Sequence, residues 1–384
     1  MNILVVNPIL VSAEYYIIPE ISSIKETMIY TMCLGFVANG HQVTLAAAAD
    51  YKPVPEEEGY DFEVLFFKSV LKRLFYPAAL PLSFDFYKYL KANHKKFDLV
   101  ISSEIFSIAS FFASVVCPAK TVIWHEMTIF QNKLKKIPAK LWYWVVVPLF
   151  IRRVRCIIPR SGKAASFIRK YLKNVSEDIV DHGINVSKFN FSKEKNRQVI
   201  SSSRLVPGKN IESIILIYSK LIKIKGFEDI KLLIAGDGFA RKSLESLVEE
   251  LNLQKQVTFS GFLKQKELNE VIKKSLVFMI NTLRDQNMLS IPESIVSGTP
   301  VITNLLPASA DYIAREKLGI AKDKWDEFDL IEIIENNRFY VDNCVKYRDK
   351  QTNSYCAKQI VDIFLKPTLF PRRQQSFVFE QGKK

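Results

Sequence analysis

Two cationic residues in the second half of the 384-residue chain are spaced so that they could bind one anion. Arg204 and Lys209 stand in a loop that contains Pro207 and Gly208 and follows a strand expected over 198–203. Both side chains can turn from such a loop toward a phosphate, and arginine can contact it through two parallel hydrogen bonds. Two surface cations on an ordinary loop would give the same pattern, so the pair is not decisive by itself.

A second stretch, residues 281–304, combines acidic side chains with a helix start. Its pattern predicts a strand end, a polar loop, a short helix and another strand. Ser290 followed three positions later by Glu293 fits a capping box. A loop that enters a helix offers free backbone N–H groups and a positive dipole end, which suit a diphosphate. The backbone groups at this start belong to Met288, Leu289 and Ser290.

Two carboxylates flank this loop. Asp285 and Glu293 are eight positions apart, and this spacing can place both groups around one sugar-sized volume. Glu293 has a structural alternative, because a glutamate at the third helical position can serve only to cap the helix.

The stretch resembles the motif of two glutamates separated by seven residues in the retaining glycosyltransferases of family 4, which have the GT-B fold. Glu293 matches the second glutamate, whereas Asp285 stands in place of the first. Residues 286–288 (QNM) replace the family's usual small residues, and residues 298–301 (GTPV) match its GxPV segment. The resemblance implies that Glu293 accepts hydrogen bonds from the donor ribose and that Asp285 contacts the donor sugar.

Four further segments carry the resemblance. Residues 203–209 (SRLVPGK) are similar to the family's GRLxxxKG, 232–238 (LLIAGDG) to LxIxGxGP, 257–262 (VTFSGF) to VxFxGxx, and 181–189 (DHGINVSKF) to NGID…F. In the family, the arginine and lysine of the first segment bind the donor diphosphate. This implies that role for the cation pair, Arg204 and Lys209.

The matches at 232–238 and 257–262 imply contacts with the nucleotide, each through a single residue. Gly236 would let the backbone approach the nucleotide, and Phe262 would lie at the base pocket.

His125 ends a strand expected over 120–125, and ligands of open parallel sheets bind beyond the carboxyl ends of strands. A neutral imidazole there could hydrogen-bond a sugar hydroxyl, as the resemblance also implies. The alternative is a histidine bonded to nearby backbone.

Alternating strand and helix patterns predict an α/β protein with two Rossmann-like parallel-sheet domains that face a central cleft. Residues 2–8 form a continuous apolar run, as expected for a strand buried on both faces. Helices expected within 327–365 include one that crosses back to the first domain. The predicted ranges are 1–185 for an acceptor-binding domain, 186–197 for a linker, 198–365 for a nucleotide-sugar-binding domain and 366–384 for a tail.

Composition limits the partners and the compartment. The chain has 54 Lys+Arg and 40 Asp+Glu, a net charge of +14, which favours acidic partners. Five scattered cysteines without a CxxC pair fit a reducing compartment, with neither disulfides nor structural zinc. The first residues lack the basic region of a signal peptide, and the apolar run 141–151 is about half a membrane span. We therefore expect a cytoplasmic protein.

Residues 120–173 hold thirteen basic residues and one acid, Glu126, around the aromatic segment 141–144 (LWYW). Basic and aromatic groups on one amphipathic surface suit an anionic membrane interface, which predicts peripheral attachment to the inner face of the cell membrane. The alternative is a solvated basic face with its tryptophans in the core. No nucleic-acid partner is expected, because the chain shows no zinc-finger spacing, RNA-binding aromatic signature or reader helix.

The sequence thus predicts an enzyme that transfers a sugar, with retention, from a nucleoside diphosphate sugar to a saccharide or lipid-linked acceptor in cell-envelope or exopolysaccharide biosynthesis. No cofactor or metal is expected, because the cation pair would neutralise the departing diphosphate. Two alternatives remain open: a catalytically inactive partner protein that binds sugar nucleotides, and a nucleotide-sugar epimerase of the same fold.

Overall fold

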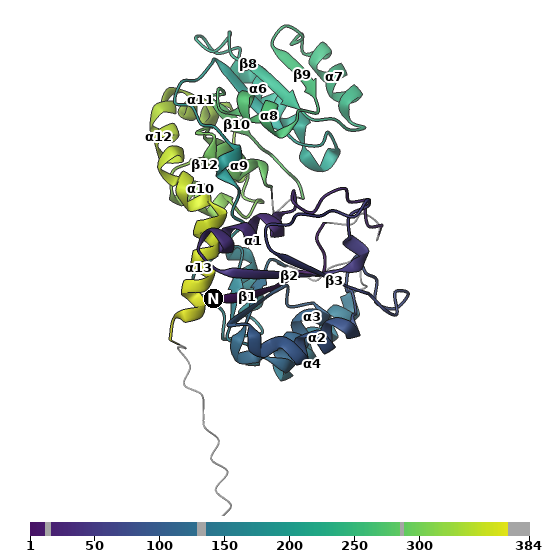
Figure 1. Ribbon diagram of the computed structural model, residues 1–384. Helices are drawn as coiled ribbons and strands as arrows, with labels where there is room; N and C mark the ends of the chain where they lie inside the picture. Colours follow the sequence, from purple (N-terminus) through teal and green to yellow (C-terminus); the bar gives the residue numbers. More distant parts are fainter. Residues whose placement is uncertain (12–16, 129–135, 285–287, 368–384) are drawn as a thin grey trace, which may run out of the picture.

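The structure is a computed structural model, and it describes every residue except 12–16, 129–135, 285–287 and 368–384. Two lobes lie one above the other, each with a six-stranded parallel sheet and covering helices (Figure 1). The predicted class, two Rossmann-like parallel-sheet domains, is confirmed. No helix in the described part of the chain is both long and apolar enough to span a bilayer.

The N-terminal sheet has the order β3-β2-β1-β4-β5-β6, with β1 at its centre. Strand β1 is buried on both faces along Ile3 to Val6, which explains why its sequence is continuously apolar rather than alternating. The strands are β1 (Asn2–Val6), β2 (Gln42–Ala48), β3 (Glu63–Phe67), β4 (Leu99–Ser103), β5 (Thr121–His125) and β6 (Cys156–Pro159).

Helices cover both faces of this sheet. Serines cap three of them, because Ser83, Ser107 and Ser161 each accept a hydrogen bond from a backbone N–H of the first turn. Helices α2, α3 and α4 lie together below the sheet in Figure 1, whereas α1 lies above it. The helices are α1 (Met28–Ala38), α2 (Phe84–Asn93), α3 (Ile108–Val116), α4 (Lys136–Leu149) and α5 (Gly162–Ile168).

The C-terminal sheet has the order β12-β11-β10-β7-β8-β9. Its strands are β7 (Gln198–Ser202), β8 (Lys231–Ala235), β9 (Val257–Gly261), β10 (Val277–Met279), β11 (Val301–Thr303) and β12 (Gly319–Ala321). Its helices are α6 (Ile211–Leu221), α7 (Arg241–Glu250), α8 (Gln265–Ile272), α9 (Ser290–Val296), α10 (Ala310–Arg315), α11 (Glu327–Glu335) and α12 (Asn337–Tyr347).

The last described helix, α13 (Asn353–Leu365), returns to the N-terminal lobe and packs against α1 (Figure 1). Asn353 donates its side-chain N–H to the carbonyl of Thr31 at 2.7 Å, and Asn39 donates to the carbonyl of Ser354 at 2.8 Å. The range 198–365 assigned to the second domain therefore ends in a helix that belongs to the core of the first. The predicted tail, 366–384, lies almost wholly outside the described residues.

Three sequence predictions need correction. Ser290 does not cap its helix, because the cap position is Leu289 and no side chain accepts a hydrogen bond there. The sequence pattern also predicts a strand over 177–181, but these residues form none, and the backbone N–H of Val180 donates to the carbonyl of Pro159 at the end of β6 at 3.0 Å. The sequence analysis also missed α10 and β12, which are short elements of six and three residues.

Replacement of Gly35 by alanine tests the docking of α13. A Cβ atom on Gly35 would lie 2.3 Å from the backbone oxygen of Asn353, so we expect a loss of about 1–3 kcal/mol in unfolding free energy. Helix propensity alone predicts the opposite sign, a gain of about 1 kcal/mol. Urea unfolding of the two proteins decides, and a more stable variant would contradict the close contact.

Candidate active site between the two lobes

Most of the predicted donor-binding residues follow adjacent strands of the C-terminal sheet. Arg204 and Lys209 follow β7, Gly236 follows β8, Phe262 follows β9 and Glu293 lies beyond β10. These four strands are neighbours in one parallel sheet, so the loops after them emerge at the same edge. The structure thus brings the five residues to one edge, as a nucleotide site requires.

Hydrogen bonds join the loop of the cation pair to the loop after β10. The carbonyl of Gly208 accepts from the backbone N–H of Leu283 at 2.9 Å and from the hydroxyl of Thr282 at 3.2 Å. Lys209 closes a 3-10 turn beside Gly208, while Arg204 is exposed five residues earlier. The loop of Arg204 and Lys209 is therefore held beside the start of the loop that leads to Glu293.

Gly236 fixes the position of the arginine loop by close packing of backbone. Its φ angle is +122°, and a Cβ atom there would lie 1.9 Å from the carbonyl oxygen of Ser203. The backbone N–H of Leu205 donates to the carbonyl of Asp237 at 2.9 Å, which joins the same two loops. In this structure the predicted nucleotide-facing glycine thus also sets where Arg204 stands.

Glu293 lies in the first turn of α9 and is largely buried. Burial raises its pKa to about 7, partly offset by a hydrogen bond from the side-chain amide of Gln265 at 3.5 Å. A carboxyl whose pKa lies near 7 is partly protonated at physiological pH, so it can accept or donate a hydrogen bond. Met288, Leu289 and Ser290 lie three to five positions before it, at the start of α9, with Leu289 exposed. Asp285, the other predicted carboxylate, lies outside the described residues.

Phe262 is 80% exposed at the end of β9, and Phe239 in the loop after β8 is similarly exposed. Sequence reasoning singled out only the first of these. Their loops are joined by a hydrogen bond from the backbone N–H of Gly236 to the carbonyl of Gly261 at 2.8 Å. Two open aromatic faces on neighbouring loops can offer stacking surfaces to a planar base.

His125 ends β5 in the opposite lobe, and its side chain is completely buried. Its Nδ1 lies 3.0 Å from a carboxylate oxygen of Glu104, and its ring stacks on Phe167. The partner is therefore a carboxylate rather than the nearby backbone that the sequence alternative suggested. The imidazole is therefore enclosed in this conformation, and Glu104 is its charged neighbour.

The sequence analysis missed Glu104, although it follows the end of β4 just as His125 ends β5. The same rule about strand ends could have identified it. Its carboxylate also accepts the backbone N–H of Glu126 at 2.8 Å. Burial raises the pKa of Glu104, but His125, Arg160 and this N–H outweigh burial and leave the pKa below its ordinary value.

An ion pair also lies at this edge of the N-terminal sheet. Arg160 donates to the carboxylate of Glu126 at 2.6 Å, and its guanidinium lies 3.6 Å from the centre of the Trp124 ring. Burial raises the pKa of Glu126, with Arg160 acting against it. Asp181, further along this edge, has its pKa raised to about 6, also by burial.

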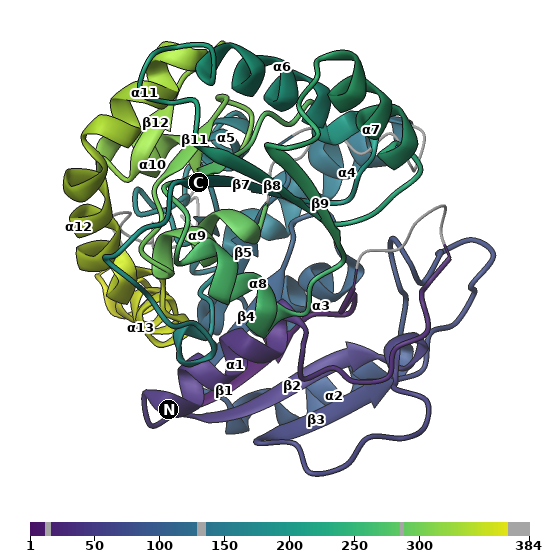
Figure 2. The ribbon, with the colours of Figure 1, turned by 90° about the horizontal axis from the view of Figure 1, so that it is seen from above.

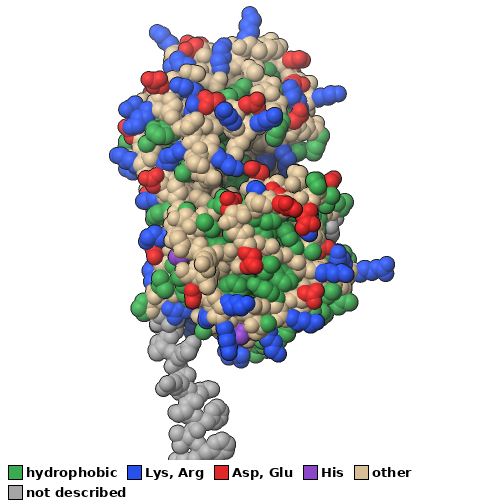
Figure 3. Space-filling model, viewed as in Figure 1, with side chains coloured by type: hydrophobic (Ala, Val, Ile, Leu, Met, Phe, Trp, Pro, Cys, Tyr) green, Lys and Arg blue, Asp and Glu red, His purple; other side chains and the backbone are tan. Residues whose placement is uncertain are grey.

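The carboxyl edges of the two sheets face each other. Lys163, after β6, donates to the carbonyls of Leu305 and Leu306, after β11, at 2.8 Å each. A cavity of about 210 Å³ is lined by Arg160 and His182 of one lobe and by Tyr312 of the other. Figure 3 shows the molecule hollowed between its lobes. Both lobes therefore contribute residues to the cleft between them.

Solved structures with the same fold come from glycosyltransferases. HepE of Anabaena, in complex with UDP, matches with a TM-score of 0.63 and 15% identity over 94% of this chain and 99% of its own. Sucrose-phosphate synthase of Thermosynechococcus elongatus matches with a TM-score of 0.63 and 16% identity over 94% and 98%. The fold and its cleft therefore define a GT-B protein.

Sequence families identify the chain further. The family described as glycosyl transferases group 1 matches residues 184–350, and glycosyltransferase family 4 matches residues 26–188. The two matches adjoin and together extend from residue 26 to residue 350. The protein belongs to the group 1 glycosyltransferases with the GT-B fold.

Curated relatives are distant. Alpha-monoglucosyldiacylglycerol synthase of Streptococcus pneumoniae is 25% identical over 186 residues, which are 44% of this chain and 42% of that protein. The chain therefore matches less than half the length of this relative. The O-antigen biosynthesis glycosyltransferase WclY of Escherichia coli is 24% identical over 72% of this chain and 81% of its own length.

Titration of Glu293 should make the ligand-free protein less stable as the pH rises from about 4.5 to 7. Its pKa is higher in the folded chain than in the unfolded chain, so the folded chain keeps a proton that the unfolded chain releases. The loss attributable to this group is up to about 3 kcal/mol.

Glu293→Gln cannot titrate and should remove this component. Urea unfolding of both proteins at pH 4.5, 6 and 7.5 measures it, and their difference cancels shared groups such as Asp181. A difference that does not change with pH would show that Glu293 is not desolvated.

Proposed function

We propose that the protein is a retaining glycosyltransferase that moves a sugar from a nucleoside diphosphate sugar to a hydroxyl of a saccharide or lipid-linked acceptor. The observation that carries this proposal is the convergence of the loop of Arg204 and Lys209 with the loop that leads to Glu293. We propose that this edge and the Glu104 side of the N-terminal sheet border the same cleft. A donor held by one lobe would thus meet an acceptor held by the other.

The proposed reaction breaks the bond between the anomeric carbon and the diphosphate oxygen. The acceptor hydroxyl oxygen forms the new bond to that carbon, and its proton leaves with the nucleoside diphosphate. Negative charge grows on the departing diphosphate, so cations placed there in advance stabilise the transition state. Arg204 and Lys209 supply these cations, and we propose that no metal is needed.

The remaining donor contacts follow the family motif. Glu293 would accept hydrogen bonds from the ribose hydroxyls, and Asp285 would contact the sugar. The backbone from Met288 to Ser290 would border the diphosphate. Retention also rests on the motif. It is tested by following the anomeric proton of the product by NMR during the first turnovers.

His125 is proposed as a positioning residue. Together with the backbone N–H of Glu126, His125 stabilises the ionised carboxylate of Glu104. This carboxylate would lie on the acceptor side of the cleft. The names of two relatives, a monoglucosyldiacylglycerol synthase and an O-antigen biosynthesis glycosyltransferase, support an acceptor of the cell envelope.

Removal of the cations tests the proposal. A panel of UDP-, GDP-, ADP-, CMP- and dTDP-sugars in thermal-shift assays first identifies the donor. Arg204→Ala and Lys209→Ala should each lower the turnover number by roughly 10²–10³-fold, as loss of a transition-state donor does elsewhere. Lys225→Ala, an exposed cation beyond α6, is the matched control and should keep full activity.

Near-normal transfer by both cation variants would refute the assignment. Conversion of the donor to an epimer without any acceptor, or donor binding without turnover, would favour one of the two alternative functions.

A membrane surface is the proposed site of attachment, on the outer face of α4. Leu141, Trp144, Val145 and Leu149 are 43–77% exposed and recur at intervals of three and four residues, so they form one stripe. Tyr143 is instead buried, and the indole N–H of Trp142 donates to the carbonyl of Ile105 at 3.0 Å. The aromatic segment therefore has an inner and an outer face.

Exposed cations flank the stripe: Lys140, Arg152 and Arg153. An apolar stripe with basic neighbours and an outward tryptophan fits the interface of an anionic bilayer. Each cation near such a surface contributes about 1 kcal/mol. We propose that the protein is peripheral on the inner face of the membrane.

Vesicle sedimentation tests this surface. The double variant Leu141→Ser, Trp144→Ser should bind phosphatidylglycerol vesicles at least about tenfold more weakly, because two apolar side chains no longer leave water. The control pair Leu216→Ser, Phe339→Ser changes exposed residues of the other lobe and should bind normally. Equal binding by the α4 variant and the control would exclude α4 as the contact.

A further inference from the structure

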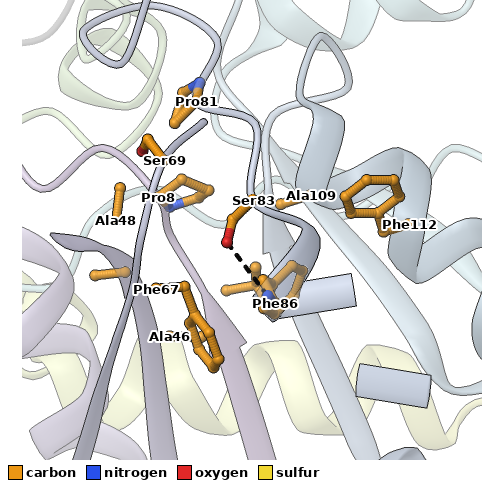
Figure 4. Close-up of a pocket in the computed structure, with 12 residues that line it drawn as sticks. Pro8, Ala46, Ala48, Phe67, Ser69, Pro81, Ser83, Phe86, Ala109 and Phe112 are labelled. Atoms are coloured by element: carbon orange, nitrogen blue, oxygen red, sulfur yellow. Dashed lines mark hydrogen bonds between the residues drawn. The ribbon is translucent and has the colours of Figure 1, made fainter. Parts of the chain in front are cut away.

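The apolar hollow of the N-terminal lobe is too small to take a substrate. It lies between β2, α2 and α3 and has a cavity volume of about 20 Å³ (Figure 4). This is room for about one water molecule. Its lining is mainly apolar and includes Ala46, Phe67, Phe86 and Phe112. The side chains that bear on the proposed donor site lie instead in the C-terminal lobe, where the linker segment 186–197 meets α9.

One arginine holds helix α9 from its C-terminal end. Arg348 begins the 3-10 turn after α12, and its guanidinium donates to the carbonyl of Val296, the last residue of α9. A carbonyl in the last turn of a helix has no partner within the helix, so this contact satisfies it. Val296 stands three positions after Glu293, which is less than one turn of the helix.

The same guanidinium binds the linker. It donates to the carbonyls of Val186 at 2.9 Å and of Phe189 at 2.6 Å, and it lies 5.4 Å from the centre of the Phe191 ring. A planar guanidinium offers five donors in fixed directions, so one group can bridge three carbonyls, whereas a lysine ammonium is a compact point charge. Arg348 thus joins the linker to the helix of Glu293.

Asn269 makes a second connection from the linker to the same helix. The residue is 3% exposed, and its side-chain oxygen accepts the backbone N–H of Asn190 at 2.9 Å. Its side-chain N–H groups donate to the carbonyl of Asn190 at 3.0 Å and to the hydroxyl of Ser297 at 2.7 Å. Ser297 in turn donates its hydroxyl to the carbonyl of Glu293 at 2.7 Å. A continuous chain of hydrogen bonds therefore runs from the linker to Glu293.

Apolar packing holds α9 on its other side. Ile291 and Ile295 of α9 are buried in one core with Cys344 of α12, and α9 lies beside α12 in the view from above (Figure 2). Apolar attraction is not directional, whereas hydrogen bonds weaken steeply when their partners turn away. The hydrogen bonds at the end of α9 therefore help to fix its rotation and its position along its own axis.

We propose that Arg348 and Asn269 are positioning residues for the donor, because they fix α9 against the linker so that the carboxyl of Glu293 meets the donor ribose. This inference rests on the role proposed for Glu293 and names two further residues that act on it. Neither side chain has to touch the sugar nucleotide. A misplacement of about 1 Å that originates far from the reacting atoms can cost about 10²-fold in rate, so such distant contacts matter.

A double-mutant cycle on donor affinity tests the inference. The probe is UDP-glucose, or whichever sugar nucleotide of the thermal-shift panel gives the largest shift, and it is titrated by calorimetry. Arg348→Lys keeps the charge but not the fork of donors, and it should weaken donor binding by about tenfold. In the Glu293→Ala background the same change should weaken binding by less than about twofold, because the acceptor that it misplaces is already absent.

Matched variants control for the substitutions themselves. Arg338→Lys makes the same change at an exposed position of α12 and should leave donor affinity unchanged. Asn269→Asp keeps the accepting oxygen but removes both donated hydrogen bonds, so it tests the second connection and serves if Arg348→Lys does not fold. Its control is Asn337→Asp, which removes a hydrogen bond to the carbonyl of Leu276 instead.

Equal weakening with and without the carboxyl of Glu293 would overturn the inference, because Arg348 would then support the fold rather than act through that carboxyl. Unchanged donor affinity in both Arg348→Lys and Asn269→Asp would overturn it too. These outcomes leave donor binding by the wild type intact and so refute only the positioning role. A wild-type protein that binds none of the sugar nucleotides would instead count against glycosyl transfer itself, and the inference would fall with it.

Discussion

The return of α13 to the first lobe is the contact on which the geometry of the cleft depends. Cys356, Ala357 and Ile360 of this helix are buried with α1 and β1 in one hydrophobic core. Their burial ties the end of the chain to its beginning, so the two sheets are joined both by the linker and by a packed helix. The packing of α13 thus fixes one side of the junction between the two sheets.

Within the C-terminal lobe, close packing of backbone atoms positions the loop of Arg204. The two glycines after β8, Gly236 and Gly238, leave no room for a Cβ atom against Ser203 and Leu205. The arginine loop is therefore held by rigid neighbours, not by the long side chain that it carries. Electrostatic stabilisation is effective when charged groups need not reorganise during the reaction, and this loop meets that condition.

Several features could be predicted from sequence because a local rule determines them. Strands such as β1 are buried on both faces and give continuous apolar runs, and turns such as that at Gly298 lie next to recognisable motifs. Ser290 shows the limit of such rules: its spacing to Glu293 fits a capping box, but Leu289 takes the cap position in a helical conformation. The sequence pattern therefore predicts the short helix correctly but assigns the wrong residue to its N-cap.

Features that arise from contacts between distant segments were not accessible. The rule about strand ends indicates the position of Glu104, but its contact with His125, within 3.0 Å on the next strand of the sheet, follows only from the topology. Arg160 and Glu126 are likewise 34 positions apart in the chain, and the pairing of β5 with β6 brings their side chains to 2.6 Å. Such sites emerge when topology is known, since periodicity reports one element at a time.

The two lobes differ in the chemistry that they expose. Arginine, lysine, glycine loops and exposed phenylalanines gather at the edge of the C-terminal sheet, whereas the N-terminal lobe carries the exposed apolar stripe of α4 and the exposed side chains of Leu71, Leu74 and Tyr76. A donor bound at the C-terminal edge and an acceptor bound by the N-terminal lobe would thus be held by different groups before they react. Binding energy from the parts of the two substrates that do not react would then serve orientation, which is how remote contacts accelerate a transfer between two substrates.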